Sequence, residues 1–173
     1  GEAATDLERG VLLDEGLEIL TRLWSGEPVD YIGEHLRATG VQFLPKPVQS
    51  PRIPIWVAGF WPHKKPMRRA ARFDGVFPLT HEAGIGGMVT VAAMRGAIDY
   101  VAAQRGNRQF DVAHAGRSTG NPAQDRALVE PYAEIGVTWW LENVNPWAFG
   151  WDERGPWPEA AIRQRIEQGP PRF

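Results

Sequence analysis

The sequence predicts an α/β protein built from about four β/α units around a parallel sheet. Residues 52–81 read in order as a strand, a turn, a short helix and a second strand. Two further apolar segments of strand length, residues 110–116 and 137–141, each follow a helical pattern. Strands that alternate with helices in this way form parallel sheets. A complete (β/α)₈ barrel has eight such units in about 250 residues, so this chain has about half of one.

The first predicted element is an amphipathic helix over residues 6–24. Thr5 and Glu8 have the spacing of a capping box, and Gly26 supplies a stop signal. Leucines and a tryptophan then recur three and four residues apart, at Leu13, Leu17, Leu20 and Trp24. Residues 26–52 change to short strand-like pieces broken by glycine and proline, which predicts an irregular insertion containing a small hairpin.

The next segment is a compact βαβ unit. Residues 53–58 are almost continuously apolar, as expected of a parallel strand that is buried on both faces, and Gly59 ends them. Pro66 fits the first turn of a short helix. A turn at Asp74 and Gly75 then leads into the second strand, residues 76–79.

Two more β/α units complete the predicted order. A helix begins near Met88 and ends at Gly106, and a second one begins at Asn121 and Pro122 and ends before Gly136. The strands at 110–116 and 137–141 precede and follow this second helix. Residues 143–157 form a loop rich in tryptophan, and a last helix covers residues 158–168.

Composition limits the classes of function. The chain has 173 residues, of which 43% are hydrophobic, so we expect one domain over residues 1–173. A net charge of −2 gives no sign of nucleic-acid binding. There is no cysteine, no metal-ligand spacing, no apolar run near the ~20 residues of a membrane span and no signal pattern. We therefore expect a cytoplasmic protein with small molecules or proteins as partners, no membrane contact and no metal.

The order of these segments resembles the C-terminal half of the luciferase-like monooxygenase superfamily. The resemblance covers residues 13–80 well and continues more loosely to Leu141. It rests on two stretches, LDEGLEILTRLWSGEPVDYIGEHLRATGVQFLPKPVQSPRIPIWVAG and AARFDGVFPL. These proteins are TIM-barrel oxidoreductases that use reduced flavin mononucleotide (FMN) or a deazaflavin coenzyme. The resemblance makes residues 53–58 the fifth barrel strand, so this chain would be the second half of a barrel and incomplete by itself.

The resemblance also implies a place for the phosphate-bearing tail of the cofactor. The family's Ala-Gly after strand 5 falls on Ala58 and Gly59, and its polar position after strand 6 falls on Thr80. Glycine allows a close backbone approach, and a threonine hydroxyl can donate to a phosphate oxygen. Phe60 and His81 stand where relatives often have small residues, and we count both as cofactor-binding candidates. His81 is also the candidate catalytic residue.

An isolated half-barrel exposes two sheet edges and a broad apolar face, which must be covered. A second copy of the chain or a missing N-terminal half could cover them. The sequence thus leaves two functions open. The chain is a flavin- or deazaflavin-dependent oxidoreductase, or the cofactor-binding half of one; alternatively it is a noncatalytic half-barrel that homodimerises through its open face and binds no cofactor.

Several other side chains have both a functional and a structural interpretation. His63 and His114, like His81, lie near predicted strand ends, where a hydride-transfer enzyme uses a proton donor or a substrate anchor. A single loop histidine is more often a surface residue. Trp139 and Trp140 suit either a hydrophobic substrate pocket or core packing.

Overall fold

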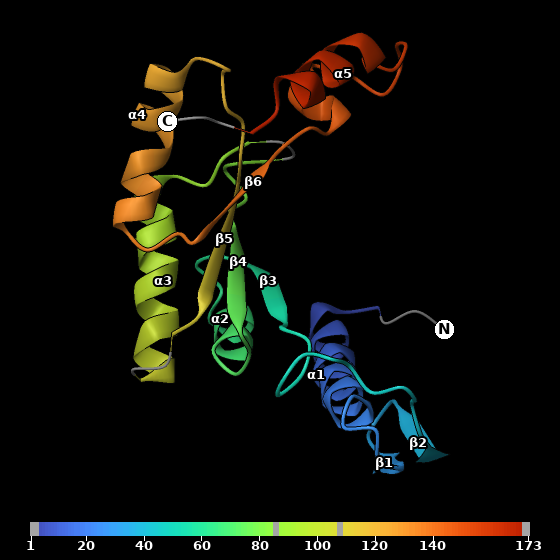
Figure 1. The fold of residues 1–173 in the computed structure, drawn as a ribbon. Coiled ribbons are helices and arrows are strands. Elements are labelled where there is room, and N and C mark those ends of the chain that lie inside the picture. Colours follow the sequence, from blue (N-terminus) through green and yellow to red (C-terminus); the bar gives the residue numbers. More distant parts are fainter. Residues whose placement is uncertain (1–3, 85–86, 107–108, 171–173) are drawn as a thin grey trace. The chain divides into compact units, whose positions relative to one another are not determined.

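The computed structural model describes residues 4–84, 87–106 and 109–170. The contacts of the chain group into two compact units, Gly1–Pro54 and Ile55–Phe173, and each is described by itself. Both contain helices and strands, which confirms the α/β class (Figure 1). That both units belong to a single domain over residues 1–173 stays a prediction. Within the described residues, every helix is too short or too polar to cross a membrane.

The first unit is a helix with a β-hairpin. Helix α1 covers Asp6–Leu23, strand β1 covers Val29–Ile32 and strand β2 covers Arg37–Val41. Thr5 and Glu8 form the predicted capping box, and the two strands pair antiparallel. The predicted helix and the hairpin within the insertion are therefore both confirmed.

A buried carboxylate joins the helix to the tip of the hairpin. Glu15 of α1 is 8% exposed and accepts hydrogen bonds from the amides of Glu34 (2.6 Å), His35 (3.1 Å) and Leu36 (2.8 Å). Burial by itself raises the pKa of this carboxyl, but the three amides outweigh burial and hold its pKa below the ordinary value. A single side chain of the helix thus binds three consecutive backbone N–H groups of the turn.

The second unit is a four-stranded parallel sheet with helices on one side. The strands are β3 (Trp56–Phe60), β4 (Gly75–Leu79), β5 (Asp111–Gly116) and β6 (Trp139–Glu142), and they lie in that order across the sheet. The connecting helices are α2 (Lys64–Ala70), α3 (Val91–Arg105) and α4 (Pro122–Glu134). Figure 1 shows α3 and α4 stacked along the same side of the sheet. The predicted β/α alternation is confirmed.

Alternate strand residues face the helices and form the core. Val57, Val76 and Val112 are buried on this side, with Met67 of α2 and Met94 of α3 packed in the same layer. One position in this layer has no room for a side chain. A Cβ atom added to Gly59 would overlap the ring of Pro66, so this glycine lets α2 lie directly on β3.

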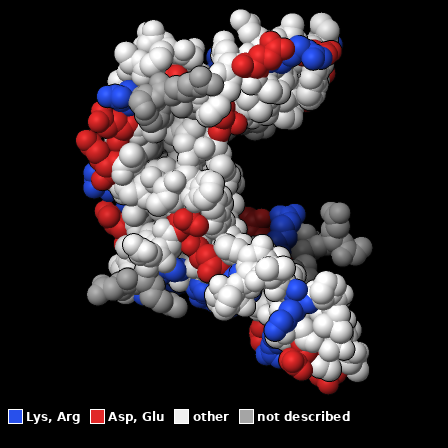
Figure 2. Space-filling model, viewed as in Figure 1, with Lys and Arg blue, Asp and Glu red and all other residues white. Residues whose placement is uncertain are grey.

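The opposite face of the sheet is open. Phe60 is 39% exposed and Trp139 is 50% exposed, and Ala58 beside them is also exposed. Trp139 contacts Trp56, whose indole N–H donates to Asp111 (3.0 Å). β3 and β6 are the outer strands of this sheet, and each presents one unpaired edge within it. In Figure 2, charged side chains of both signs lie over α3 and α4, whereas the surface over the middle of β5 is largely uncharged.

Three boundaries differ from the predictions. β3 begins at Trp56 rather than Ile53, because Pro54 cannot donate to a ladder; Ile55 instead accepts turn hydrogen bonds at its carbonyl. α3 begins at Val91 rather than Met88, because the Thr90 side chain caps it. The tryptophan-rich loop contains a short 3₁₀ helix, η1 (Pro146–Phe149), where a loop without helix is predicted.

The last helix, α5 (Glu159–Gln168), is held by one buried arginine. Arg165 is 7% exposed, and its guanidinium donates to Glu142 Oε1 (3.0 Å), to the carbonyl of Gly169 (2.6 Å) and to Ser118 Oγ (2.5 Å). Glu142 ends β6 and Ser118 follows β5. This network ties α5 to the carboxyl ends of two neighbouring strands.

Candidate functional site

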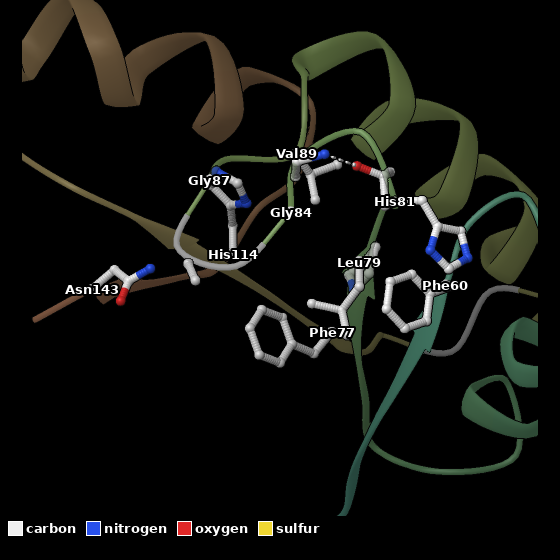
Figure 3. A pocket seen from close by; sticks show the side chains of 13 residues that line it. Phe60, Phe77, Leu79, His81, Gly84, Gly87, Val89, His114 and Asn143 are labelled. Carbon is white, nitrogen blue, oxygen red and sulfur yellow. Dashed lines mark hydrogen bonds between the residues drawn. The ribbon is translucent and has the colours of Figure 1, made fainter. Parts of the chain in front are cut away.

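A hollow of about 470 Å³ lies at the carboxyl ends of the parallel strands. This edge is where parallel α/β folds bind ligands, because the loops after the strands converge there. Figure 3 shows the lining side chains, which come from all four strands or the loops that follow them. The lining residues are Phe60, Phe77, Pro78, Leu79, Thr80, His81, Ala83, Gly84, Gly87, Val89, His114, Ala115 and Asn143.

The wall formed by β3 and β4 is aromatic and aliphatic. Phe77 and Leu79 project from β4 on the open face of the sheet, and Phe60 lies beside them on β3 (Figure 3). The ring of Phe60 stacks on the imidazole of His81, with centroids 4.2 Å apart and planes at 6°. His63 adds an edge contact to His81 at 6.0 Å. A flat, apolar ligand surface would find matching rings here.

Thr80 supplies a polar group at the end of β4. Its side chain is buried, and its Oγ1 accepts a hydrogen bond from the amide of Ala83 at 3.3 Å. Since a hydroxyl has one donor and two acceptor positions, the O–H itself remains available to donate. This geometry fits the predicted role of Thr80 as a donor to a ligand oxygen.

The five predicted site residues separate into two groups. Phe60, Thr80 and His81 line the hollow together, whereas Ala58 and Gly59 do not. Ala58 lies exposed on the open face, and Gly59 turns toward Pro66 of α2. A glycine at this strand end allows a close backbone approach, as predicted, and the group that approaches it is helix α2. Cofactor binding by all five residues stays a prediction.

His114 was singled out in the sequence only as one of three strand-end histidines, yet it is the most unusual polar group of the lining. It is 1% exposed and stacks on Tyr132 of α4, with centroids 4.3 Å apart. Burial lowers its pKa to about 4. Within the described part of the chain, neither ring nitrogen has a hydrogen-bond partner. The only sequence signal for His114 was its place among small residues in a short predicted strand, and this pattern did not indicate that the side chain is buried.

Three amides of the loop after β5 are not free to bind an anion. Ser118 donates its amide to Glu142 Oε1 (2.9 Å), and the amides of Thr119 (2.6 Å) and Gly120 (3.1 Å) donate to Asp125. Burial alone raises the pKa of Asp125, but its hydrogen bonds from residues 119 and 120 outweigh burial and lower it. The two carboxylates therefore take the place of an anion at these three amides.

A metal site is absent from the residues that the structure describes, since no three potential ligands come together there. Asn143, which follows β6, was not anticipated as a lining residue. Its amide carries both donors and an acceptor, and Figure 3 shows it across the hollow from Leu79 and His81. The site thus combines apolar walls with a few polar groups, as small-molecule sites do.

The sequence matches one protein family over most of its length. A family profile described as luciferase-like monooxygenase matches residues 6–165. The matched range covers most of the chain and includes every residue that lines the hollow. The family implies oxidoreductase chemistry and a TIM-barrel fold. The resemblance noted in the sequence is thereby confirmed, and the chain belongs to the luciferase-like monooxygenase family.

Proposed function

We propose that the chain is the cofactor-binding half of a flavin- or deazaflavin-dependent oxidoreductase. The observation that carries the proposal is the aromatic-walled hollow at the carboxyl ends of the parallel strands, in a chain of this family. Its volume of about 470 Å³ lies within the usual range of small-molecule sites.

The lining fits the ring system of such a cofactor. Phe60, Phe77 and Leu79 offer apolar surfaces to a flat ring, and the Asn143 amide offers donors and an acceptor to its polar edge. For the phosphate-bearing tail, the hollow offers the Thr80 hydroxyl as a donor, with His81 exposed beside it. No lysine or arginine is among the lining residues, so the tail would be held by neutral donors.

When bound, the reduced flavin or deazaflavin supplies the hydride or activates oxygen, and no protein nucleophile is required. The chain's own residues bind and orient the ring. The apolar wall of Phe77 and Leu79 excludes water from its face, and the Thr80 hydroxyl fixes one end of the ligand. His81, exposed at the mouth and stacked on Phe60, is positioned to exchange a proton with a substrate.

We further propose that the open face of the sheet is covered in the active protein. Two arrangements would close a barrel, a separate N-terminal half and a second copy of this chain. In either, new strands pair with the outer edges of β3 and β6, and Trp139 and Phe60 become interior residues. Closure would also add further walls to the hollow, since Phe60 belongs both to the open face and to the lining of the hollow.

The proposal is tested by titrating the purified chain with FMN and with a deazaflavin coenzyme, followed by flavin fluorescence and calorimetry. We expect saturable binding that is lost in Leu79→Trp, because the indole fills the hollow. Val48→Trp is the matched control, since Val48 is 98% exposed in the first unit. If neither cofactor binds the parent chain, or if Leu79→Trp binds as the parent does, the proposed site is wrong.

A second candidate function is a noncatalytic half-barrel that homodimerises and binds no cofactor. The exposure of Trp139 and Phe60 favours it, because monomers seldom leave such rings uncovered on a flat sheet face. A dimeric mass together with no binding of either cofactor would select this candidate over the oxidoreductase.

A further inference from the structure

A carboxylate stands on the open, otherwise apolar face of the sheet. Asp111 begins β5, and its neighbour Val112 packs toward the helices. Because successive side chains of a strand point to opposite faces, the Asp111 side chain belongs to the open face. The other residues of β3–β6 that alternate onto this face are aromatic, aliphatic or glycine. Among these described strand residues, Asp111 therefore carries the one charge.

Two tryptophans from opposite sides of the sheet meet beside this carboxylate. Trp56 lies on β3 and Trp139 on β6, the two outer strands, yet their ring centroids are 5.2 Å apart. The rings thus reach over β4 and β5, and Gly75 leaves room for them, since a Cβ atom there would overlap the Trp56 ring. The Trp56 indole N–H donates to Asp111 Oδ2 at 3.0 Å. The carboxylate belongs to a cluster that spans the open face.

The Asp111 carboxylate has few partners. The Thr138 hydroxyl lies 3.4 Å from its Oδ1 and also 3.4 Å from the carbonyl oxygen of Val112, so these two acceptors share one proton. Within the described part of the chain, Asp111 forms no ion pair. The side chain is only partly buried here. A barrel closed over this face would remove it further from water, and burying a carboxylate without a cation is costly.

This charge distinguishes the two arrangements that would close the barrel. A second copy brings a second Asp111 to the same level of the interior, and the described strands of its open face bring no cation. Like charges in such an interior repel each other, which works against this partner. A different segment can supply a cation instead. Arginine fits best, because its guanidinium pairs with a carboxylate and stacks on an indole, and Trp139 is 50% exposed.

We propose that the open face is covered by a β/α segment different from this one, and that this segment carries an arginine that pairs with Asp111 and stacks on Trp139. This inference rests on the proposed covering of the sheet. It does not depend on the cofactor site, because Asp111 lies at the amino end of β5 and the hollow lies at the carboxyl ends of the strands. Asp111 thus selects the partner by its charge.

The test uses a charge-reversed copy of the chain as the probe for such a partner. Sedimentation equilibrium compares the parent, Asp111→Arg and their equimolar mixture, and circular dichroism checks that each variant is folded. Asp111→Asn, which keeps the shape of the side chain and removes only its charge, is measured in parallel. The matched control is Asp99→Arg, the same charge change at an exposed position of α3.

We expect the parent and Asp111→Arg to sediment separately as single chains of 19.3 kDa. Their mixture should associate about tenfold or more tightly than either chain alone, because the two charges then attract. Asp111→Asn should self-associate more tightly than the parent, since the repulsion is gone. A mixture of the parent with Asp99→Arg should not associate. Adding Trp139→Glu to Asp111→Arg should abolish association with the parent, which locates the contact on the open face.

Two results would overturn the inference. If the parent alone sediments as a dimer that Trp139→Glu dissociates, a second copy covers the face; the inference fails and the proposed covering stands. If the mixture and Asp111→Asn associate no more tightly than the parent, the charge of Asp111 does not select the partner. In both cases the titrations with FMN and the deazaflavin coenzyme decide separately on the proposed function.

Discussion

Gly59 shows how one missing side chain sets the distance between a strand and its helix. A methyl group at this position would overlap Pro66, which lies in the first turn of α2. Glycine is therefore required by packing between β3 and α2. The same requirement explains why a glycine follows the buried strand whether or not a ligand approaches its backbone.

We predict that Gly59→Ala destabilises the chain by about 1–3 kcal/mol, the usual effect of overpacking in a core. The free energy of unfolding is measured by urea titration. Adding Pro66→Gly removes the atoms that the new methyl meets, so the double variant should lose less stability than the sum of the two single changes. Ala58→Ser, at an exposed neighbour on the other face, is the control. Additive losses in the double variant would contradict this packing explanation.

At the scale of elements, α1 and the hairpin depend on Glu15. The carboxylate accepts three backbone amides, and a glutamine side chain has only one acceptor oxygen, so Glu15→Gln leaves at least one amide without its partner. We predict that the amide protons of residues 34–36 exchange faster in Glu15→Gln, together with a lower unfolding temperature. Glu27→Gln, at an exposed position of the same unit, is the control.

This contribution has a defined pH dependence. The pKa of Glu15 in the folded protein lies below the ordinary glutamate value of 4.5, because three backbone amides donate to its carboxylate. The ionised carboxylate therefore stabilises the folded state above that pH. As the pH falls through the unfolded pKa toward the folded one, the contribution is lost. We therefore expect the difference in unfolding temperature between the parent and Glu15→Gln to be constant near neutral pH and to shrink below about pH 4.5. A constant difference down to pH 3 would show that ionisation of Glu15 plays no part.

The sequence predicted the helices and strands better than the contacts that their side chains make. Helical spacing, caps and turn residues are local signals, and they located α1, α4, α5 and the four parallel strands. The burial of Glu15 and His114 depends on contacts between residues distant in the sequence, which local patterns do not encode. For the same reason the sequence selected Thr80 and His81 at a strand end but did not predict Asn143, which reaches the hollow only through the order of strands in the sheet.

At the scale of the molecule, the open sheet face is the feature that the proposed barrel has to close. If a second copy closes it, the sedimenting mass of the purified chain should exceed the 19.3 kDa of one chain. Trp139→Glu places a charge on this face and should return the mass to that of one chain. Glu27→Gln should leave the mass unchanged. A parent chain that sediments as a monomer at micromolar concentration would rule out the second copy and leave a separate N-terminal half.

The arginine that holds α5 also has a consequence for the order of folding during synthesis. Domains begin to fold from the N-terminus as the ribosome extends them. Ser118 and Glu142 line up at the ends of β5 and β6, but the guanidinium that joins them comes from residue 165. The rim of the sheet beside the hollow therefore reaches its final hydrogen bonding only after residue 165 has left the ribosome.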